Sequence, residues 1–183
     1  MSQNQGIFDV GLAQNPANFQ ALTPLSFLSW AEEVYGVRTA LIHGKARFTY
    51  AQFGARCRRL ASALAGRGIG QGDTVSLMSP NTPPMLEAHY GVPMIGAVLN
   101  SLNYRLDAST IAFILDHGES KVIITDREFS PVVSEALSIL DRDIIVIDVD
   151  DPLANGGDLI GEKDYEAFLE EGEPTHPMSM PDD

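Results

Sequence analysis

Four short apolar runs decide the fold: TVSLM at 74–78, GAVL at 96–99, VIIT at 122–125 and IIVI at 144–147. Turn residues or residues that begin helices bound each run, which is typical of buried strands. Helical patterns lie between the runs, near 83–95, 108–116 and 131–140. Strands that are apolar on both faces and alternate with helices indicate an α/β fold, with a mainly parallel sheet covered by helices on both faces.

The residues before the first run predict two helices and a hairpin. Thr23 and Pro24 favour a helix start, and the apolar stripe ends at Gly36, so a helix is expected over 24–35. Two short β-rich runs at 39–42 and 46–49 flank a turn and predict a hairpin. The spacing of Thr49 and Gln52 matches a capping box, so a long helix is expected from there to Gly68.

The pattern weakens after Asp148, where polar and acidic residues dominate. A short helix is expected at 165–171, and three prolines follow within 174–183. The sequence therefore predicts three parts. These are an N-terminal leading segment at 1–22, an α/β subdomain at 23–148 and an acidic linker at 149–183.

The formal net charge of −13 comes almost entirely from the end of the chain. Residues 1–140 hold eleven acidic and ten basic side chains, whereas 141–183 hold fourteen and two. Such a chain would repel nucleic acid and anionic membrane surfaces. Residues 38–67 are the exception, with seven basic and no acidic side chains. Their expected partner is an acidic patch of the same protein or a missing part of it, ahead of a ligand phosphate.

The single cysteine, Cys57, excludes an intramolecular disulfide and a Cys-rich zinc site. Together with the absence of an export signal and of a run of about 20 apolar residues, it predicts a cytoplasmic protein with no integral membrane association. For this thiol we expect a packing role on a helix, or mild surface reactivity, rather than catalysis. Arg58 and Arg59 lie beside it and could depress its pKa.

Several polar motifs favour structural roles over chemistry. The glycines of 68–73 leave a helix and enter a strand, the reverse of a dinucleotide-binding loop, so they predict a turn. The four histidines have no metal-ligand spacing, and the acidic residues of 148–158 do not match a calcium loop and favour a solvated one. We therefore expect no catalytic residue and no metal site in these 183 residues.

The polar segment 100–106, NSLNYRL, is the best site candidate, because it follows an apolar run and precedes a helix capped by Asp107. Ligands of doubly wound sheets gather at such strand ends. Arg105 stands alone there among polar residues, and its guanidinium suits phosphate recognition. The alternative is that Arg105 pairs with an acidic side chain, which isolated arginines usually do.

Five stretches together resemble the opening part of AMP-forming acyl-CoA synthetases of the adenylate-forming superfamily: FTYAQF at 48–53, the run 60–75, SPNT at 79–82, HYGVPMIGAVLN at 89–100 and NYRL at 103–106. The likeness extends over about 22–148. It is greatest to bacterial short- and medium-chain fatty acyl-CoA and 3-methylmercaptopropionyl-CoA ligases.

The resemblance implies a two-step ligase. ATP and a carboxylate give an acyl-adenylate and pyrophosphate, and the thiol of CoA then displaces AMP. ATP, CoA and Mg²⁺ would serve the intact parent protein, and none would bind tightly to this chain alone. The implied substrate is a short- or medium-chain fatty acid or a methylthio-substituted acid. A homodimer is a further expectation for the parent protein.

In that family the phosphate loop with its lysine, the acyl pocket and the C-terminal domain lie downstream of the part that these residues resemble. We therefore expect an inactive N-terminal fragment, whose last residues resemble the approach to the phosphate loop. The resemblance assigns one site residue, Arg105, to the phosphates of CoA. Two alternatives stay open, a free-standing α/β nucleotide-binding module and a regulatory interaction module whose acidic tail engages 38–67.

Overall fold

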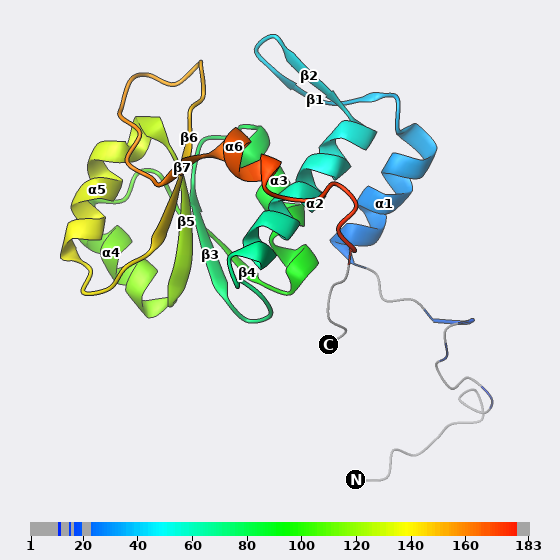
Figure 1. The fold of residues 1–183 in the computed structure, drawn as a ribbon, viewed down its shortest axis with the longest axis horizontal. Helices are drawn as coiled ribbons and strands as arrows, with labels where there is room; N and C mark the ends of the chain where they lie inside the picture. The colour runs from blue at the N-terminus through cyan, green and yellow to red at the C-terminus, as the bar shows by residue number, and fades with distance from the viewer. Residues whose placement is uncertain (1–10, 12–14, 16, 20–22, 179–183) are drawn as a thin grey trace.

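The computed structural model describes residues 23–178 together with 11, 15 and 17–19. Its centre is a five-stranded parallel sheet in the order β4-β3-β5-β6-β7 (Figure 1). The strands are β3 (Thr74–Met78), β4 (Val98–Ser101), β5 (Ser120–Asp126), β6 (Ile145–Val149) and β7 (Lys163–Asp164). The prediction of a mainly parallel sheet is confirmed.

Two strands differ from the sequence prediction. The run expected at 96–99 begins instead at Val98, because Gly96 takes the left-handed conformation, with φ of 71°, and ends the short turn η1 (Pro93–Ile95). The strand β7 was not expected, because Lys163 and Asp164 are polar and the strand has only two residues. It forms through pairing with β6, at Ile147 and Asp148.

Helices cover both faces of the sheet, as predicted (Figure 1). The helices α4 (Ala108–His117) and α5 (Ser130–Ile139) pack over Met78 and Ile123 on one face. On the other face, α2 (Tyr50–Gly66), α3 (Pro83–Gly91) and α6 (Tyr165–Glu170) share a core with Val75, Leu77 and Ile124. The alternation of side chains along each strand separates these two cores.

The residues before the sheet fold as the sequence predicts. The helix α1 (Pro24–Tyr35) begins with a capping box between Thr23 and Ser26, and α2 begins with one between Thr49 and Gln52. Between them, β1 (Thr39–His43) and β2 (Ala46–Thr49) form an antiparallel hairpin that stands apart from the main sheet. No helix among the described residues is long and apolar enough to span a membrane.

The segment expected as an acidic linker contains packed structure. Tyr165, Phe168 and Leu169 of α6 are at most 2% exposed and lie in the same core as Leu60 and Leu64 of α2. Phe168 and Leu169 follow Tyr165 by three and four residues, which places all three side chains on one face of a short helix. Part of 149–183 therefore packs against the rest of the fold.

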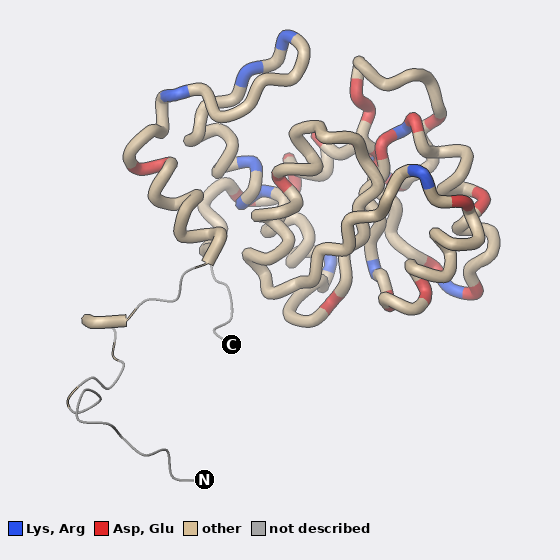
Figure 2. Tube along the Cα trace, turned by 180° about the vertical axis from the view of Figure 1, so that it is seen from behind, with Lys and Arg blue, Asp and Glu red and all other residues tan. Residues whose placement is uncertain are grey.

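The basic segment 38–67 finds its acidic partners within the chain. Arg56 pairs with Glu166, and Arg67 pairs with Glu162 and Glu171. In Figure 2, basic and acidic positions lie side by side where α6 meets α2, whereas the β1–β2 hairpin carries basic positions alone. An acidic patch of the same protein and a missing part of it were both expected ahead of a ligand phosphate, and for Arg56 and Arg67 the first of these is confirmed.

Candidate functional site

The loop after β3 brings a short polar segment to the carboxyl end of the sheet. The hydroxyl oxygens of Ser79 and Thr82 lie 2.8 Å apart in a buried hydrogen bond, and the backbone N–H of Thr82 donates to the carbonyl of Pro80 at 2.7 Å. Pro83 and Pro84 follow in the first turn of α3. These bonds fix Asn81 at the rim of the site.

The loop after β4 is fixed beside it. The backbone N–H of Leu102 donates to Leu77, and the backbone N–H of Arg105 donates to the side chain of Asn103 at 3.0 Å. The ring of Tyr104 stacks on Phe129, with 5.7 Å between the ring centroids. The loop is therefore anchored to β3 and to the residues that follow β5.

Arg105 lies in this loop as an exposed cation. Its guanidinium lies 5.8 Å from the centroid of the Tyr104 ring, and it forms no ion pair with any residue that the structure describes. The alternative of pairing with an acidic side chain is therefore not seen within the described part of the chain. An unpaired guanidinium held over an aromatic ring can bind a phosphate or a carboxylate.

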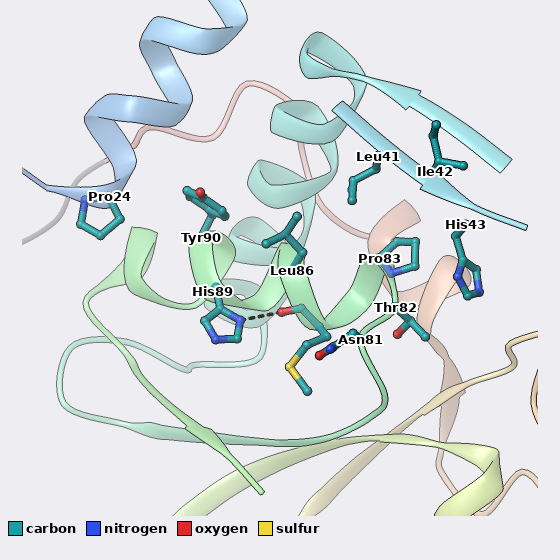
Figure 3. A pocket seen from close by; sticks show the side chains of 11 residues that line it. Pro24, Leu41, Ile42, His43, Asn81, Thr82, Pro83, Leu86, His89 and Tyr90 are labelled. Atoms are coloured by element: carbon teal, nitrogen blue, oxygen red, sulfur yellow. Dashed lines mark hydrogen bonds between the residues drawn. The ribbon is translucent and has the colours of Figure 1, made fainter. Parts of the chain in front are cut away.

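Between the two loops lies a hollow of about 490 Å³. Its lining residues are Ser79, Asn81, Met85, His89, Ser101, Leu102, Asn103, Tyr104 and Arg105. Asn81, Met85 and His89 also line a second, more apolar hollow toward α1 and the hairpin (Figure 3). The two hollows therefore adjoin along α3, with the cation of Arg105 at one end and apolar side chains such as Leu86 at the other.

The helix starts beside this site are poor phosphate binders. Pro83 and Pro84 have no N–H to donate at the start of α3. At the start of α4 the carboxylate of Asp107 already accepts from Ser109 and Thr110, and these bonds hold its pKa below the ordinary value. Recognition of an anion here would therefore depend on the side chain of Arg105.

Each of the two histidines near the site makes one side-chain hydrogen bond. His89 donates from Nδ1 to the carbonyl of Met85 at 2.7 Å (Figure 3). His43 pairs through Nε2 with Asp151 at 2.8 Å. No group of three or more His, Cys, Asp or Glu side chains within the described ranges is arranged to hold a metal ion.

Two acidic residues expected in a solvated loop are buried instead. Asp148 is 1% exposed and accepts from the backbone N–H of Gly161 at 2.6 Å. Asp151 is 8% exposed and accepts from His43. The interpretation as a solvated loop was wrong for both, because Asp148 belongs to β6 and the hairpin reaches Asp151.

A buried ionic cluster was missed by the sequence analysis. Glu87 is fully buried and accepts from Arg56 at 2.6 Å and from the hydroxyl of Tyr165 at 2.9 Å. Burial raises the pKa of the Glu87 carboxyl, and the hydrogen bond from Arg56 opposes this shift. Because the partners come from three helices, this cluster stabilises the fold that carries the site.

Cys57 is fully buried on α2, where burial raises the pKa of its thiol. We expect dithionitrobenzoate at pH 8 to modify the folded chain at least about 100-fold more slowly than the chain in urea, because each modification requires local opening. Absorbance of the released thiolate measures both rates. Equal rates would contradict the buried position.

The comparisons with known proteins agree on one family. The family model for AMP-binding enzymes matches residues 28–183. The chain is 44% identical over 184 residues to the peroxisomal acetate/butyrate–CoA ligase of Arabidopsis thaliana, an alignment that covers 94% of this chain and 32% of that protein. It is 42% identical over 172 residues to the peroxisomal benzoate–CoA ligase of the same plant, covering 91% and 30%.

The fold is also found among solved structures. A benzoate CoA ligase from Burkholderia xenovorans LB400 superposes with a TM-score of 0.76 over 88% of this chain and 31% of that one, at 22% identity. The present chain thus spans about a third of the length of the curated relatives described here. Both are plant enzymes with different acids in their names, so the expected bacterial subgroup is not supported by them. Matched over most of its length by the family model, the chain belongs to the AMP-binding enzyme family.

Proposed function

We propose that this chain is part of an AMP-forming acid–CoA ligase. Such a ligase converts ATP and a carboxylate into an acyl-adenylate and pyrophosphate, and then transfers the acyl group to the thiol of CoA. The observation that carries the proposal is the match of the family model to residues 28–183. It is supported by 44% identity to an acetate/butyrate–CoA ligase.

Within that ligase the chain would act as scaffold. Its three lysines, Lys45, Lys121 and Lys163, do not lie in a Ser/Thr/Gly-rich loop of the kind that holds a triphosphate. ATP and Mg²⁺ would therefore be held by other parts of the whole protein, and this chain alone would bind neither them nor CoA tightly. The blocked helix start at Pro83 and Pro84 also weighs against a free-standing nucleotide-binding module.

The substrate class and the cellular setting are finer proposals. We retain a short- or medium-chain fatty acid, or a methylthio-substituted acid, as the substrate, and note that the relatives named above act on acetate, butyrate and benzoate. We retain the cytoplasm as the compartment on the ground of the single cysteine, although both relatives are peroxisomal. A homodimer also remains a proposal, which sedimentation equilibrium tests directly.

The proposal is tested by carboxylate-dependent exchange of pyrophosphate into ATP. We expect no exchange with the 183-residue chain alone. We expect exchange and CoA thioester formation when the chain replaces the matching third of the Arabidopsis acetate/butyrate–CoA ligase. A folded chimaera without activity, or sustained exchange by the isolated chain, would contradict it. Sequencing the coding DNA past Asp183 identifies the natural continuation, if there is one, for the same assay.

Arg105 is proposed to contact the phosphates of CoA. In the active chimaera we expect Arg105→Ala to raise the KM for CoA about tenfold, the size of one lost charge-assisted contact, and to leave pyrophosphate exchange unchanged. Arg38→Ala is the matched control, because Arg38 also lies over a tyrosine ring, 5.0 Å from the centroid of Tyr35. An unchanged KM for CoA in Arg105→Ala would remove this role.

A further inference from the structure

A third cavity lies under the tip of the hairpin, next to the apolar hollow of Figure 3, with which it shares His43, Thr82 and Pro83. It has a volume of about 620 Å³, within the range of small-molecule sites. Four separated segments form its walls, together with Arg56. They are the hairpin residues 43–46 and 48, the start of α3 at 82–84, the loop 149–153 after β6, and 164–166 at the start of α6.

Contacts across the cavity hold these walls in place. His43 Nε2 lies 2.8 Å from Asp151 Oδ2, which ties the hairpin to the loop after β6. Leu153 packs on Gly44: its Cδ1 atom lies 3.1 Å from the place that the Cβ of a larger residue at position 44 would occupy. The cavity is therefore formed before any ligand arrives, which lowers the entropic cost of binding.

The residues that line this cavity suit a ligand with a flat, apolar ring. It includes the rings of Phe48, Pro83, Pro84 and Pro152, and the aliphatic side chains of Val149 and Leu153. Rings of this kind offer flat, apolar surfaces that an aromatic ring can stack against. One face of Phe48 is already taken by Arg56, whose guanidinium lies 5.0 Å from the ring centroid.

The charged lining disfavours an anion. Four carboxylates, on Asp150, Asp151, Asp164 and Glu166, line the cavity together with two permanent cations, on Lys45 and Arg56. Asp150 is also paired with Arg127, at 2.8 Å, which leaves one carboxylate in excess of the cations. Arg56 is already bound by Glu87 and Glu166. An added carboxylate would therefore meet excess negative charge in a partly desolvated space.

His43 provides one hydrogen-bond acceptor. Because a carboxylate only accepts, Nε2 of His43 carries the proton that it donates to Asp151. In the neutral ring Nδ1 is then an acceptor, and it has no hydrogen-bond partner among the residues that the structure describes. A ligand with an O–H or N–H group would satisfy it.

We propose that this cavity is a binding site for a small aromatic molecule that is neutral or cationic and carries a hydrogen-bond donor, such as an aryl alcohol or an arylalkyl amine. The site does not depend on the ligase function proposed above. Its ligand also differs in charge from the carboxylate that the ligase would activate.

The test compares three probes that share one ring: benzyl alcohol, benzylamine and benzoate. Each is titrated into the 183-residue chain, and binding is followed through the backbone amide signals of 43–48, 149–151 and 153 in ¹H–¹⁵N spectra. We expect benzyl alcohol and benzylamine to shift these signals, and benzoate to bind at least about tenfold more weakly. Equal or tighter binding of benzoate, or no binding of any probe at 10 mM, which is about the weak limit for so small a ligand, would overturn the proposal.

Two matched variants confirm the location. Leu153→Trp is expected to fill the cavity and abolish the shifts, whereas Leu159→Trp is expected to keep them, because Leu159 lies outside the lining. The two leucines are 58% and 52% exposed, so both variants should fold. His43→Phe is expected to weaken the binding of benzyl alcohol, because it removes the hydrogen-bond acceptor Nδ1. Retained binding in Leu153→Trp would place the probe elsewhere and overturn the site.

Discussion

Replacing Glu87 with alanine is expected to lower the free energy of unfolding by about 3–5 kcal/mol, the range found when one partner of a buried ion pair is removed. The carboxylate of Glu87 is fully buried and accepts from Arg56 and Tyr165. Without it, the Tyr165 hydroxyl has no acceptor and the Arg56 guanidinium keeps only Glu166. Urea unfolding of the chain, followed by circular dichroism, measures the loss.

Controls separate the buried pair from a general effect of removing a carboxylate. Glu135→Ala, on the exposed face of α5, should change stability by less than about 0.5 kcal/mol. Tyr165→Phe should cost about 1 kcal/mol alone and less in the Glu87→Ala background, because the hydroxyl then has no acceptor to lose. A loss below about 1 kcal/mol for Glu87→Ala would contradict the contacts of this cluster.

Phe168→Ala is the second variant with a large expected effect, again a loss of about 3–5 kcal/mol. Phe168 is fully buried in the core between α6 and α2, and the guanidinium of Arg67 lies 5.6 Å from its ring centroid. Removing the ring leaves a cavity that the surrounding helices cannot fill without moving. Thermal and urea unfolding should both report the loss.

The matched control is Phe113→Ala on α4, whose side chain is 65% exposed and should contribute less than about 0.5 kcal/mol. Comparison of the two variants also tests whether the fold includes α6, because Phe168 lies inside the segment 149–183 that the sequence predicts as a linker. Equal, small effects of the two variants would mean that α6 is not packed in solution.

The elements that the sequence predicted are those set by local rules. The strands β3, β5 and β6 follow from apolar runs. The helix α1 follows from Thr23 and Pro24 at its start, and α2 follows from the capping-box spacing of Thr49 and Gln52. The loop that carries Arg105 was found because polar residues at the end of a buried strand have a fixed position in this fold class. Such signals need only neighbours in the chain.

The residues that the sequence analysis missed depend on distant partners. Glu87 meets Tyr165 across 78 positions of the chain, and His43 meets Asp151 across 108. Nothing in the residues next to Glu87 distinguishes a buried carboxylate from a solvated one on the outer face of a helix. Likewise β7 is a strand only because β6 offers it a free edge.

The sequence by itself thus determined the alternation of strands and helices, their approximate bounds and the polar loop at 100–106. Only the tertiary structure decided the strand order, the burial of Glu87 and of α6, and the two cavities beside the hairpin. The physical reason is that capping hydrogen bonds and hydrophobic periodicity involve residues only a few positions apart in the chain. The burial of a charge or the closure of a cavity depends instead on which segments meet in space.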